Sequence, residues 1–213
     1  MRSLRALARE FYQRDTTLVA RDLLGKLLVR DGPGGLTAAR ITEAEAYLGI
    51  ADPAAHTYRG RRTARVEALW GEAGCLYVYF TYGMHHCANV VTREPGVPEA
   101  VLLRGAVAVC GLDLIAARRK GRDGRDLLNG PARLCQGMAV DRALYGADLT
   151  TGGAVWLADD GFRCPLDAVT ALPRVGVAYA GEAAAWPLRF AVLLAAPAAC
   201  CRVSRPGRGD AAP

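Results

Sequence analysis

The chain has 213 residues, which suits a single domain with a sizeable hydrophobic core. Apolar residues make up 52% of it and charged residues 23%, so intrinsic disorder is excluded for the bulk of the chain. The most apolar stretch, residues 190–201, contains Pro197 and is shorter than the about 20 residues that a membrane-spanning helix needs. The N-terminal segment lacks the apolar core of a secretory signal, and we therefore expect a cytoplasmic protein.

The net charge is +6, and only Lys26 and Lys120 among the 27 basic residues are lysines. An excess of arginine suits an anionic partner such as nucleic acid, because the guanidinium group can bind phosphate through two hydrogen bonds. A compositional bias of the source genome would produce the same excess. The seven cysteines are irregularly spaced and form no CxxC pair, so we interpret them as buried thiols in a reducing compartment. Neither they nor the adjacent His85 and His86 have the spacing of a zinc site, and no metal or cofactor is expected.

In chain order, the first predicted helix begins near Thr16, with Asp15 or Thr16 able to cap it, and ends at Gly25. Glycine, proline and the alternation of apolar residues then divide the first half of the chain. The elements predicted there are a strand over 26–30, a turn over 31–35, a strand over 36–47, a loop over 48–60, a short helix over 63–70, and a hairpin of strands 76–82 and 87–91.

The second half is predicted to hold a buried strand over 101–109, a helix over 111–119, a helix opening at Gly130-Pro131, and strands over 155–157, 174–178 and 188–194. Strands do not alternate regularly with helices, which argues against a doubly wound parallel sheet. We predict a mixed α+β fold: one domain over residues 1–203 with a mostly antiparallel curved sheet, flanking helices and a protruding, tyrosine-bearing β-hairpin. Residues 204–213 are expected to form a flexible tail.

Two glutamates in the strand over 36–47 are the first candidates for chemistry. Strand alternation would place Ile41, Glu43, Glu45 and Tyr47 on one face. The two carboxylates could be solvated groups of an edge strand, or one could be a general base beside an aromatic ring. Their separation of about 6.5–7 Å along a strand also resembles the carboxylate pair of an inverting glycosidase.

Three further patterns point towards an anionic or aromatic ligand. Arg104 lies in an otherwise apolar strand and needs a carboxylate partner or a ligand, with Glu45 or Glu43 the natural choice. The tyrosines of residues 76–82 either fill a core layer or stack on bases, and Tyr82 at the hairpin tip would be exposed. The basic loop over 59–65 is either solvated surface or a set of phosphate contacts.

Six motifs occur in this order along the chain: ITEAEAYLG, DPAAH, LYVYFTYGMHHCANV, VLLRG, NGPARLCQ and PRVGVAYAG. With them, the chain resembles the 3-methyladenine (alkyladenine) DNA glycosylase family, of the kind without a helix-hairpin-helix motif, from about residue 11 to residue 194. The resemblance implies an enzyme that flips alkylated or deaminated purines out of double-stranded DNA and hydrolyses the N-glycosidic bond, leaving an abasic site.

The resemblance also implies roles for individual residues. Glu45 would be the general base that activates water, and Arg104 and the backbone carbonyl of Val177 would hold that water. Tyr82 would be the wedge that fills the gap left by the flipped base, and Glu43 matches no catalytic position. The base pocket would be formed by Tyr47, His56, Tyr79 and Asn89. Further DNA contacts would come from Arg61, Thr63, Arg65, Gly83, Met84 and Arg133.

Arg133 stands where a lysine is common in this motif, which changes the geometry of a phosphate contact. Neither lysine lies in a site motif, so we expect a monofunctional enzyme without lyase activity, because a glycosylase–lyase commonly uses an amine. The partner is expected to be damaged duplex DNA, bound by a monomer without an obligate protein partner or a membrane. Two alternatives are a nucleic-acid-binding module without catalysis and a hydrolase of small nucleosides or glycosides.

Overall fold

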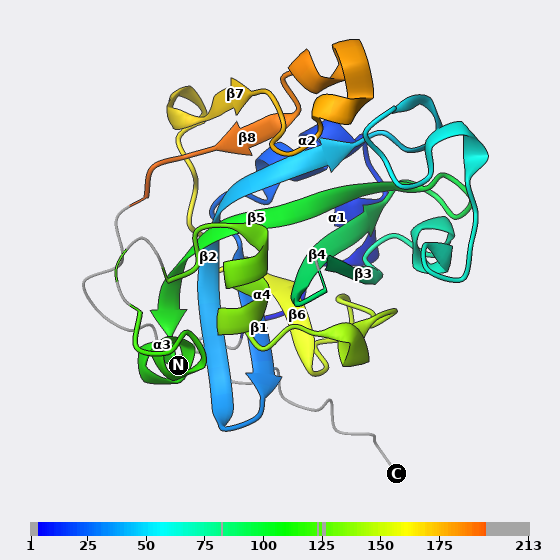
Figure 1. Cartoon of the computed structure of the whole chain (residues 1–213). Helices are drawn as coiled ribbons and strands as arrows, with labels where there is room; N and C mark the ends of the chain where they lie inside the picture. The colour runs from blue at the N-terminus through cyan, green and yellow to red at the C-terminus, as the bar shows by residue number, and fades with distance from the viewer. Residues whose placement is uncertain (1–3, 82, 123, 125–126, 195–213) are drawn as a thin grey trace.

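An eight-stranded antiparallel sheet organises the part of the chain that this computed structural model describes, residues 4–81, 83–122, 124 and 127–194 (Figure 1). Its main path runs in the order β3-β4-β5-β2-β1-β6, and β8 pairs with β2 and β7. The strands are β1 (Leu27–Gly32), β2 (Gly35–Tyr47), β3 (Leu76–Thr81), β4 (His85–Thr92), β5 (Glu99–Cys110), β6 (Val155–Ala158), β7 (Thr170–Leu172) and β8 (Arg189–Ala191). This confirms the predicted mixed α+β class with an antiparallel sheet.

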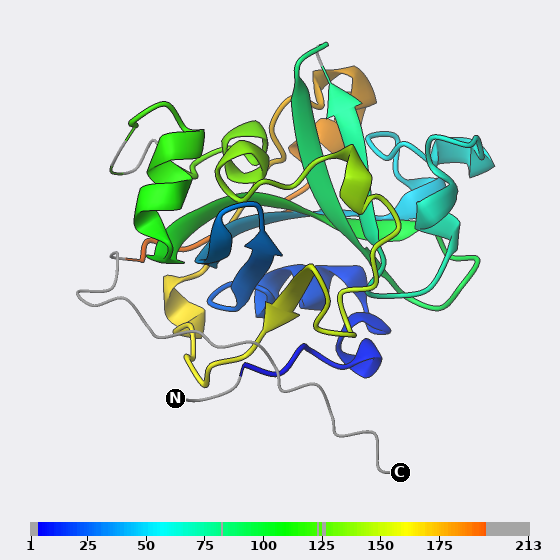
Figure 2. The same ribbon diagram turned by 90° about the horizontal axis from the view of Figure 1, so that it is seen from below.

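Short helices cover both sides of the long strands. Figures 1 and 2 place α1 (Arg9–Tyr12) and α2 (Thr16–Asp22) on one side, and α3 (Leu112–Arg118) and α4 (Pro131–Gly137) on the other. The predicted cap of α2 is confirmed, because the Asp15 carboxylate accepts hydrogen bonds from the backbone N–H groups of residues 17 and 18 at 3.0 and 3.1 Å. None of the helices in the described ranges combines the length and the hydropathy needed to cross a bilayer.

The centre of β2 is irregular, and this decides which side chains reach the site. The pairing of β2 with β5 shifts register between Ile41 and Glu43 and again between Glu43 and Ala44. Ile41 therefore packs in the hydrophobic core with Ala44 and residue 46, whereas Glu43 and Glu45 emerge on the opposite face. The prediction that Ile41 shares a face with the glutamates was wrong, because a β-bulge breaks the two-residue period on which it depended.

The predicted hairpin is formed by β3 and β4, and its tip stands out from the body of the molecule (Figure 2). Tyr82, the predicted wedge, lies outside the described residues, as does the predicted tail over 204–213. Of the helix expected over 63–70, only a 3-10 turn over Glu67–Trp70 forms. The strand expected over 174–178 is absent and that prediction was wrong: Gly176 has a φ of 78°, and the N–H of Val175 bonds to a side chain instead of a strand.

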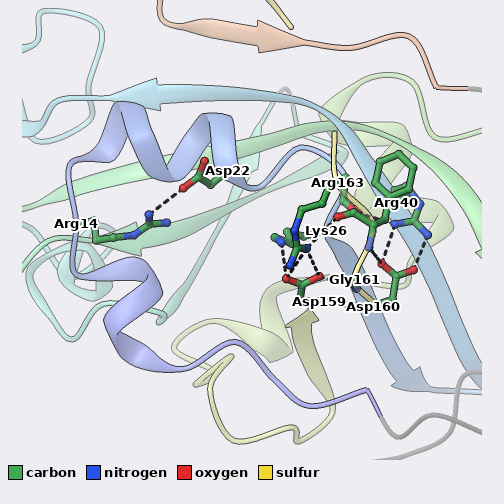
Figure 3. A network of polar contacts seen from close by, with 10 residues as sticks. Arg14, Asp22, Lys26, Arg40, Asp159, Asp160, Gly161 and Arg163 are labelled. Atoms are coloured by element: carbon green, nitrogen blue, oxygen red, sulfur yellow. Dashed lines mark hydrogen bonds and ion pairs between the residues drawn. The ribbon is translucent and has the colours of Figure 1, made fainter. Parts of the chain in front are cut away.

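A cluster of ion pairs attaches the loop after β6 to the sheet (Figure 3). Arg40 donates to both oxygens of Asp160, at 3.1 and 2.6 Å, and its guanidinium group lies 4.4 Å from the centre of the Phe162 ring. Lys26 bonds to Asp159 at 2.6 Å. Lys26, one of the two lysines of the chain, thus helps to attach this loop to the sheet.

Candidate active site

Glu45 is a buried carboxylate whose side chain is fully inaccessible to solvent. Its Oε2 accepts a hydrogen bond from the Tyr47 hydroxyl at 2.9 Å, and its Oε1 accepts one from the backbone N–H of Val175 at 2.8 Å. Burial raises the pKa of Glu45, and Arg104, these two donors and Glu43 modify the pKa by smaller amounts. A carboxylate held in this way is a stronger base than one in water.

Arg104 of β5 lies between two carboxylates, those of Glu43 and Glu45, which were the two candidate partners in the sequence analysis. Its Nε–H donates to Glu43 Oε1 at 3.0 Å, and the same nitrogen is 3.4 Å from Glu45 Oε1. Arg189 of β8 also donates to Oε1 of Glu43, at 3.0 Å. Two arginines and two glutamates thus form one partly buried cluster in which positive and negative charges alternate.

A second ion pair, between Asp52 and Arg174, supports the ring of Tyr47. Both side chains are completely buried, and the guanidinium group bonds to both carboxylate oxygens. Arg174 also donates to the carbonyl of Ala46 at 3.1 Å, and its guanidinium carbon lies 4.8 Å from the centre of the Tyr47 ring. Sequence reasoning missed this pair. Asp52 and Arg174 are far apart in the chain, and only the fold brings them together.

A cavity of about 290 Å³ opens between the hairpin, the loop over 54–57 and the segment over 175–179. Its walls are rich in aromatic rings, which come from four different segments of the chain. The ring-bearing side chains that line it are Tyr47, His56, Tyr77, Tyr79 and Tyr179. Asn89, Arg104 and Val177 also line it, whereas Glu45 lies directly behind Tyr47 and Arg104. The cavity can therefore hold a flat apolar or cationic group beside a buried carboxylate.

His56 is held against the tyrosines of β3. Its Nδ1 lies 2.9 Å from the Tyr77 hydroxyl, and its ring meets that of Tyr79 edge-on at a centroid distance of 4.6 Å. Burial, together with the nearby charges of Arg65 and Arg61, lowers the pKa of His56 to about 4. The imidazole is therefore neutral at pH 7. Tyr77 was assigned no role from the sequence, although its alternation with Tyr79 along the strand could have indicated one.

Asn89, a predicted pocket residue, and Val177, the predicted second contact of the water, occupy different positions. Asn89 is buried on β4, opposite Tyr77, and its amide donates to the carbonyl of Tyr77 at 3.3 Å. Val177 lies in a small cluster with Ala54, and its backbone carbonyl accepts the N–H of Ala180 at 2.9 Å. The backbone group of this segment that touches Glu45 is the N–H of Val175, which the sequence did not single out.

The predicted DNA contacts that the structure describes are exposed residues outside the lining of the cavity. Met84 at the hairpin tip is 70% exposed, and Gly83 beside it adopts a φ of 69°, which favours glycine. Arg65 places its guanidinium carbon 5.7 Å from the centre of the Tyr79 ring and donates to the carbonyl of Phe80 at 3.2 Å. Arg61, Thr63 and Arg133 are also exposed, the last on α4, whose first residue lines the cavity.

Comparison of the chain with known proteins identifies its family. The profile of the methylpurine-DNA glycosylase family matches residues 10–194. A relative in Desulfitobacterium hafniense is 46% identical, over 88% of this chain and 95% of its own length. Relatives in Methanocella arvoryzae (44% identical, 86% and 90%) and Carboxydothermus hydrogenoformans (47% identical, 80% and 88%) match similarly. All three bear the provisional name 3-methyladenine DNA glycosylase. The chain thus belongs to the methylpurine-DNA glycosylase family.

Proposed function

We propose that this protein is a monofunctional DNA glycosylase that removes 3-methyladenine, 7-methylguanine and hypoxanthine from duplex DNA and leaves an abasic site. The observation that carries the proposal is a buried carboxylate, Glu45, which contacts Tyr47 and Arg104 in the wall of an aromatic-lined cavity. The exposed Arg65 lies beside Tyr79, another residue of that wall. A nucleic-acid-binding module would have no use for a carboxylate whose burial raises its pKa. A hydrolase of small nucleosides would not need the protruding hairpin and its exposed Met84.

In the proposed reaction, Glu45 removes a proton from a water molecule at the edge of the cavity nearest Arg104. The water oxygen forms a bond to C1′ of the sugar while the bond between C1′ and the base nitrogen breaks, and the base leaves with the bonding electrons. An N-alkylated purine is cationic before cleavage and leaves as a neutral base. Hypoxanthine needs a proton to leave in the same way. Arg104 helps to hold the water, and the Val177 carbonyl is its second proposed contact.

The aromatic rings that line the cavity are proposed to select the base that enters it. Stacking of a base on an aromatic side chain contributes about 1–3 kcal/mol, which offsets part of the cost of unstacking it from the duplex. Tyr47, His56 and Tyr79 are the proposed stacking and hydrogen-bonding partners. A cationic purine gains further from the electron-rich faces of these rings. Asn89 is proposed to exclude guanine by crowding its exocyclic amino group.

The remaining proposed contacts position the DNA. Tyr82 is the proposed wedge, next to Gly83 and Met84 at the hairpin tip. Phosphate contacts are proposed for Arg61, Thr63, Arg65 and Arg133. The protein is proposed to act as a monomer in the cytoplasm on damaged double-stranded DNA.

The monofunctional assignment is supported by the position of the lysines. A lyase commonly uses an amine to form a Schiff base with the sugar. Lys26 is bonded to Asp159 of the loop after β6, and no lysine lines the cavity formed by the described residues. Trapping of a covalent protein–DNA adduct with borohydride would contradict this assignment.

The test is base release from two labelled duplexes, one with a single hypoxanthine and one methylated, by the wild type, Glu45→Gln and Glu10→Gln. Glu10 is exposed on α1 and provides a control with the same change of charge. We expect strand breaks only after alkali, in the wild type and Glu10→Gln, and a loss of at least about 100-fold in Glu45→Gln, since proton transfer typically contributes that much. Base release that survives in Glu45→Gln would refute the assignment of the base, and no release by the wild type would refute the function.

A further inference from the structure

Glu43 matches no assigned role, yet it sits at the centre of the charge cluster beside Glu45. Its Oε1 accepts from Arg104 Nε and from Arg189 Nη1, each at 3.0 Å. Arg104 Nε is 3.4 Å from Glu45 Oε1, so the N–H of Arg104 is directed to Glu43 rather than to the proposed base.

The backbone around Glu43 is shaped to bring its carboxylate to this place. The register of β2 against β5 shifts on both sides of Glu43, and such bulges re-aim side chains next to active sites. The partner residue across the strands is Gly105, directly after Arg104. A Cβ on Gly105 would lie 3.2 Å from the Cβ of Glu43 and 3.4 Å from its Oε2, so glycine leaves the space that the side chain occupies.

We propose that Glu43 is a positioning residue for catalysis: with Arg189 as its counter-charge, it binds the Nε–H of Arg104 and thereby prevents that cation from pairing fully with Glu45. This inference rests on the proposed role of Glu45 as general base. A carboxylate that paired fully with a guanidinium group would be a weaker base, because the positive charge stabilises its ionised form. Glu43 also adds a negative charge beside Glu45, and this acts in the same direction.

The groups that face Glu45 come from every element packed around it. Glu43 and Tyr47 lie on β2, Arg104 on β5 and Cys87 on β4. The segment after β7 contributes the uncharged N–H of Val175, and β8 acts through Arg189 on Glu43. Burial raises the pKa of the Cys87 thiol and of the Tyr47 hydroxyl, so both stay neutral near pH 7. The charged groups that act on Glu45 directly are Glu43 and Arg104, and Arg189 acts on it through Glu43. The Arg174–Asp52 pair lies against the ring of Tyr47, where its two charges offset each other.

Two substitutions should move the acid limb of the pH profile in opposite directions. Glu43→Gln keeps an oxygen that can accept from Arg104 but removes the negative charge. The acid limb of kcat/KM should shift down by roughly half to one pH unit, and the rate on the plateau should fall a few-fold because Glu45 is then a weaker base. Arg189→Gln removes one of the two cations that bond to Glu43 and leaves more of its negative charge to act on Glu45, so the limb should shift up by a similar amount. Arg189→Lys keeps the charge and should restore the wild-type profile.

The same shifts can be measured without DNA. Titration of the Glu45 side-chain carboxyl by ¹³C NMR, with its signal assigned by Glu45→Gln, should show its pKa lowered in Glu43→Gln and raised in Arg189→Gln. Glu10→Gln is the charge-matched control and should leave the titration unchanged. Loss of packing alone would not produce shifts of opposite sign.

The inference is refuted if both substitutions shift the titration the same way, or if neither shifts it. Should Glu43→Gln fail to fold, the comparison of Arg189→Gln with Arg189→Lys decides the matter: an unmoved titration in Arg189→Gln refutes the inference. If the NMR shifts occur but the wild type releases no base, the electrostatic arrangement stands and the proposed function fails. If base release depends on Glu45 but the titration does not respond to Glu43, the function stands and this inference fails.

Discussion

Removal of one partner of the Asp52–Arg174 pair should destabilise the protein strongly. Both side chains are 0% exposed, and the Asp52 carboxylate accepts from the N–H of Leu48 at 3.0 Å and of Ala54 at 2.9 Å as well as from Arg174. In Asp52→Ala the guanidinium group stays buried without its counter-charge. A buried charge left in this way costs about 3–5 kcal/mol, which is a large share of the roughly 5–15 kcal/mol by which domains are stable.

The assay is urea unfolding followed by tryptophan fluorescence, with the free energy of unfolding extrapolated to water. Asp52→Ala should lose about 3–5 kcal/mol, and Asp52→Ala combined with Arg174→Met should lose clearly less than the sum of the two single substitutions. A loss below about 1 kcal/mol in Asp52→Ala, or simple additivity in the double variant, would show that the pair contributes little to the stability of the fold.

The pH dependence gives an independent check of this pair. Burial by itself would raise the pKa of Asp52, but the hydrogen bonds from Arg174, Leu48 and Ala54 outweigh it, and the net pKa is lowered. A carboxyl whose pKa is lower in the folded state contributes stability above its unfolded pKa of about 3.9, and that stability is lost as the pH falls towards the folded value. The free energy of unfolding should therefore fall less steeply below about pH 4 in Asp52→Ala than in the wild type.

Three further predictions concern single groups. His56 should titrate with a pKa of about 4, so its ¹⁵N NMR signals should show a neutral ring at pH 6, and a protonated ring there would contradict its burial beside Arg65. Gly105→Ala should lower kcat at least several-fold while the fold is retained, because its Cβ would lie 3.2 Å from that of Glu43; unchanged kcat would mean that the side chain can move freely. Tyr12→Phe should be neutral or stabilising in thermal unfolding, since the buried Tyr12 hydroxyl has no hydrogen-bond partner among the described residues; a loss above about 1 kcal/mol would reveal one.

Local patterns in the sequence were sufficient for the elements whose signals are local. The Asp15 cap, the β-hairpin and the long strands of β2 and β5 were predicted because capping, turn residues and apolar alternation act over a few positions. Because Arg104 lies in an apolar strand, the sequence also predicted that it needs a partner such as Glu43 or Glu45. The structure confirms this: Glu43 accepts a hydrogen bond from Arg104, and Glu45 lies close by. The family resemblance, confirmed by the comparisons, rests on motifs that are likewise local.

Features that depend on pairing between distant segments were not predictable in this way. The bulge in β2 moves Ile41 into the core, and it is visible only in the register against β5. The predicted strand over 174–178 fails for a similar reason, since the N–H of Val175 finds its acceptor on Glu45 rather than on a neighbouring strand.

What the sequence by itself determined about this protein is its family, its α+β class and six of the residues that line the cavity: Tyr47, His56, Tyr79, Asn89, Arg104 and Val177. The tertiary structure alone decided how their charges are shared: Arg104 between two carboxylates, Arg189 on Glu43, and Arg174 on Asp52 beneath Tyr47. The physical reason is that a motif fixes which groups are present, whereas the basicity of a buried group depends on its distances to charges in other strands and on its removal from water.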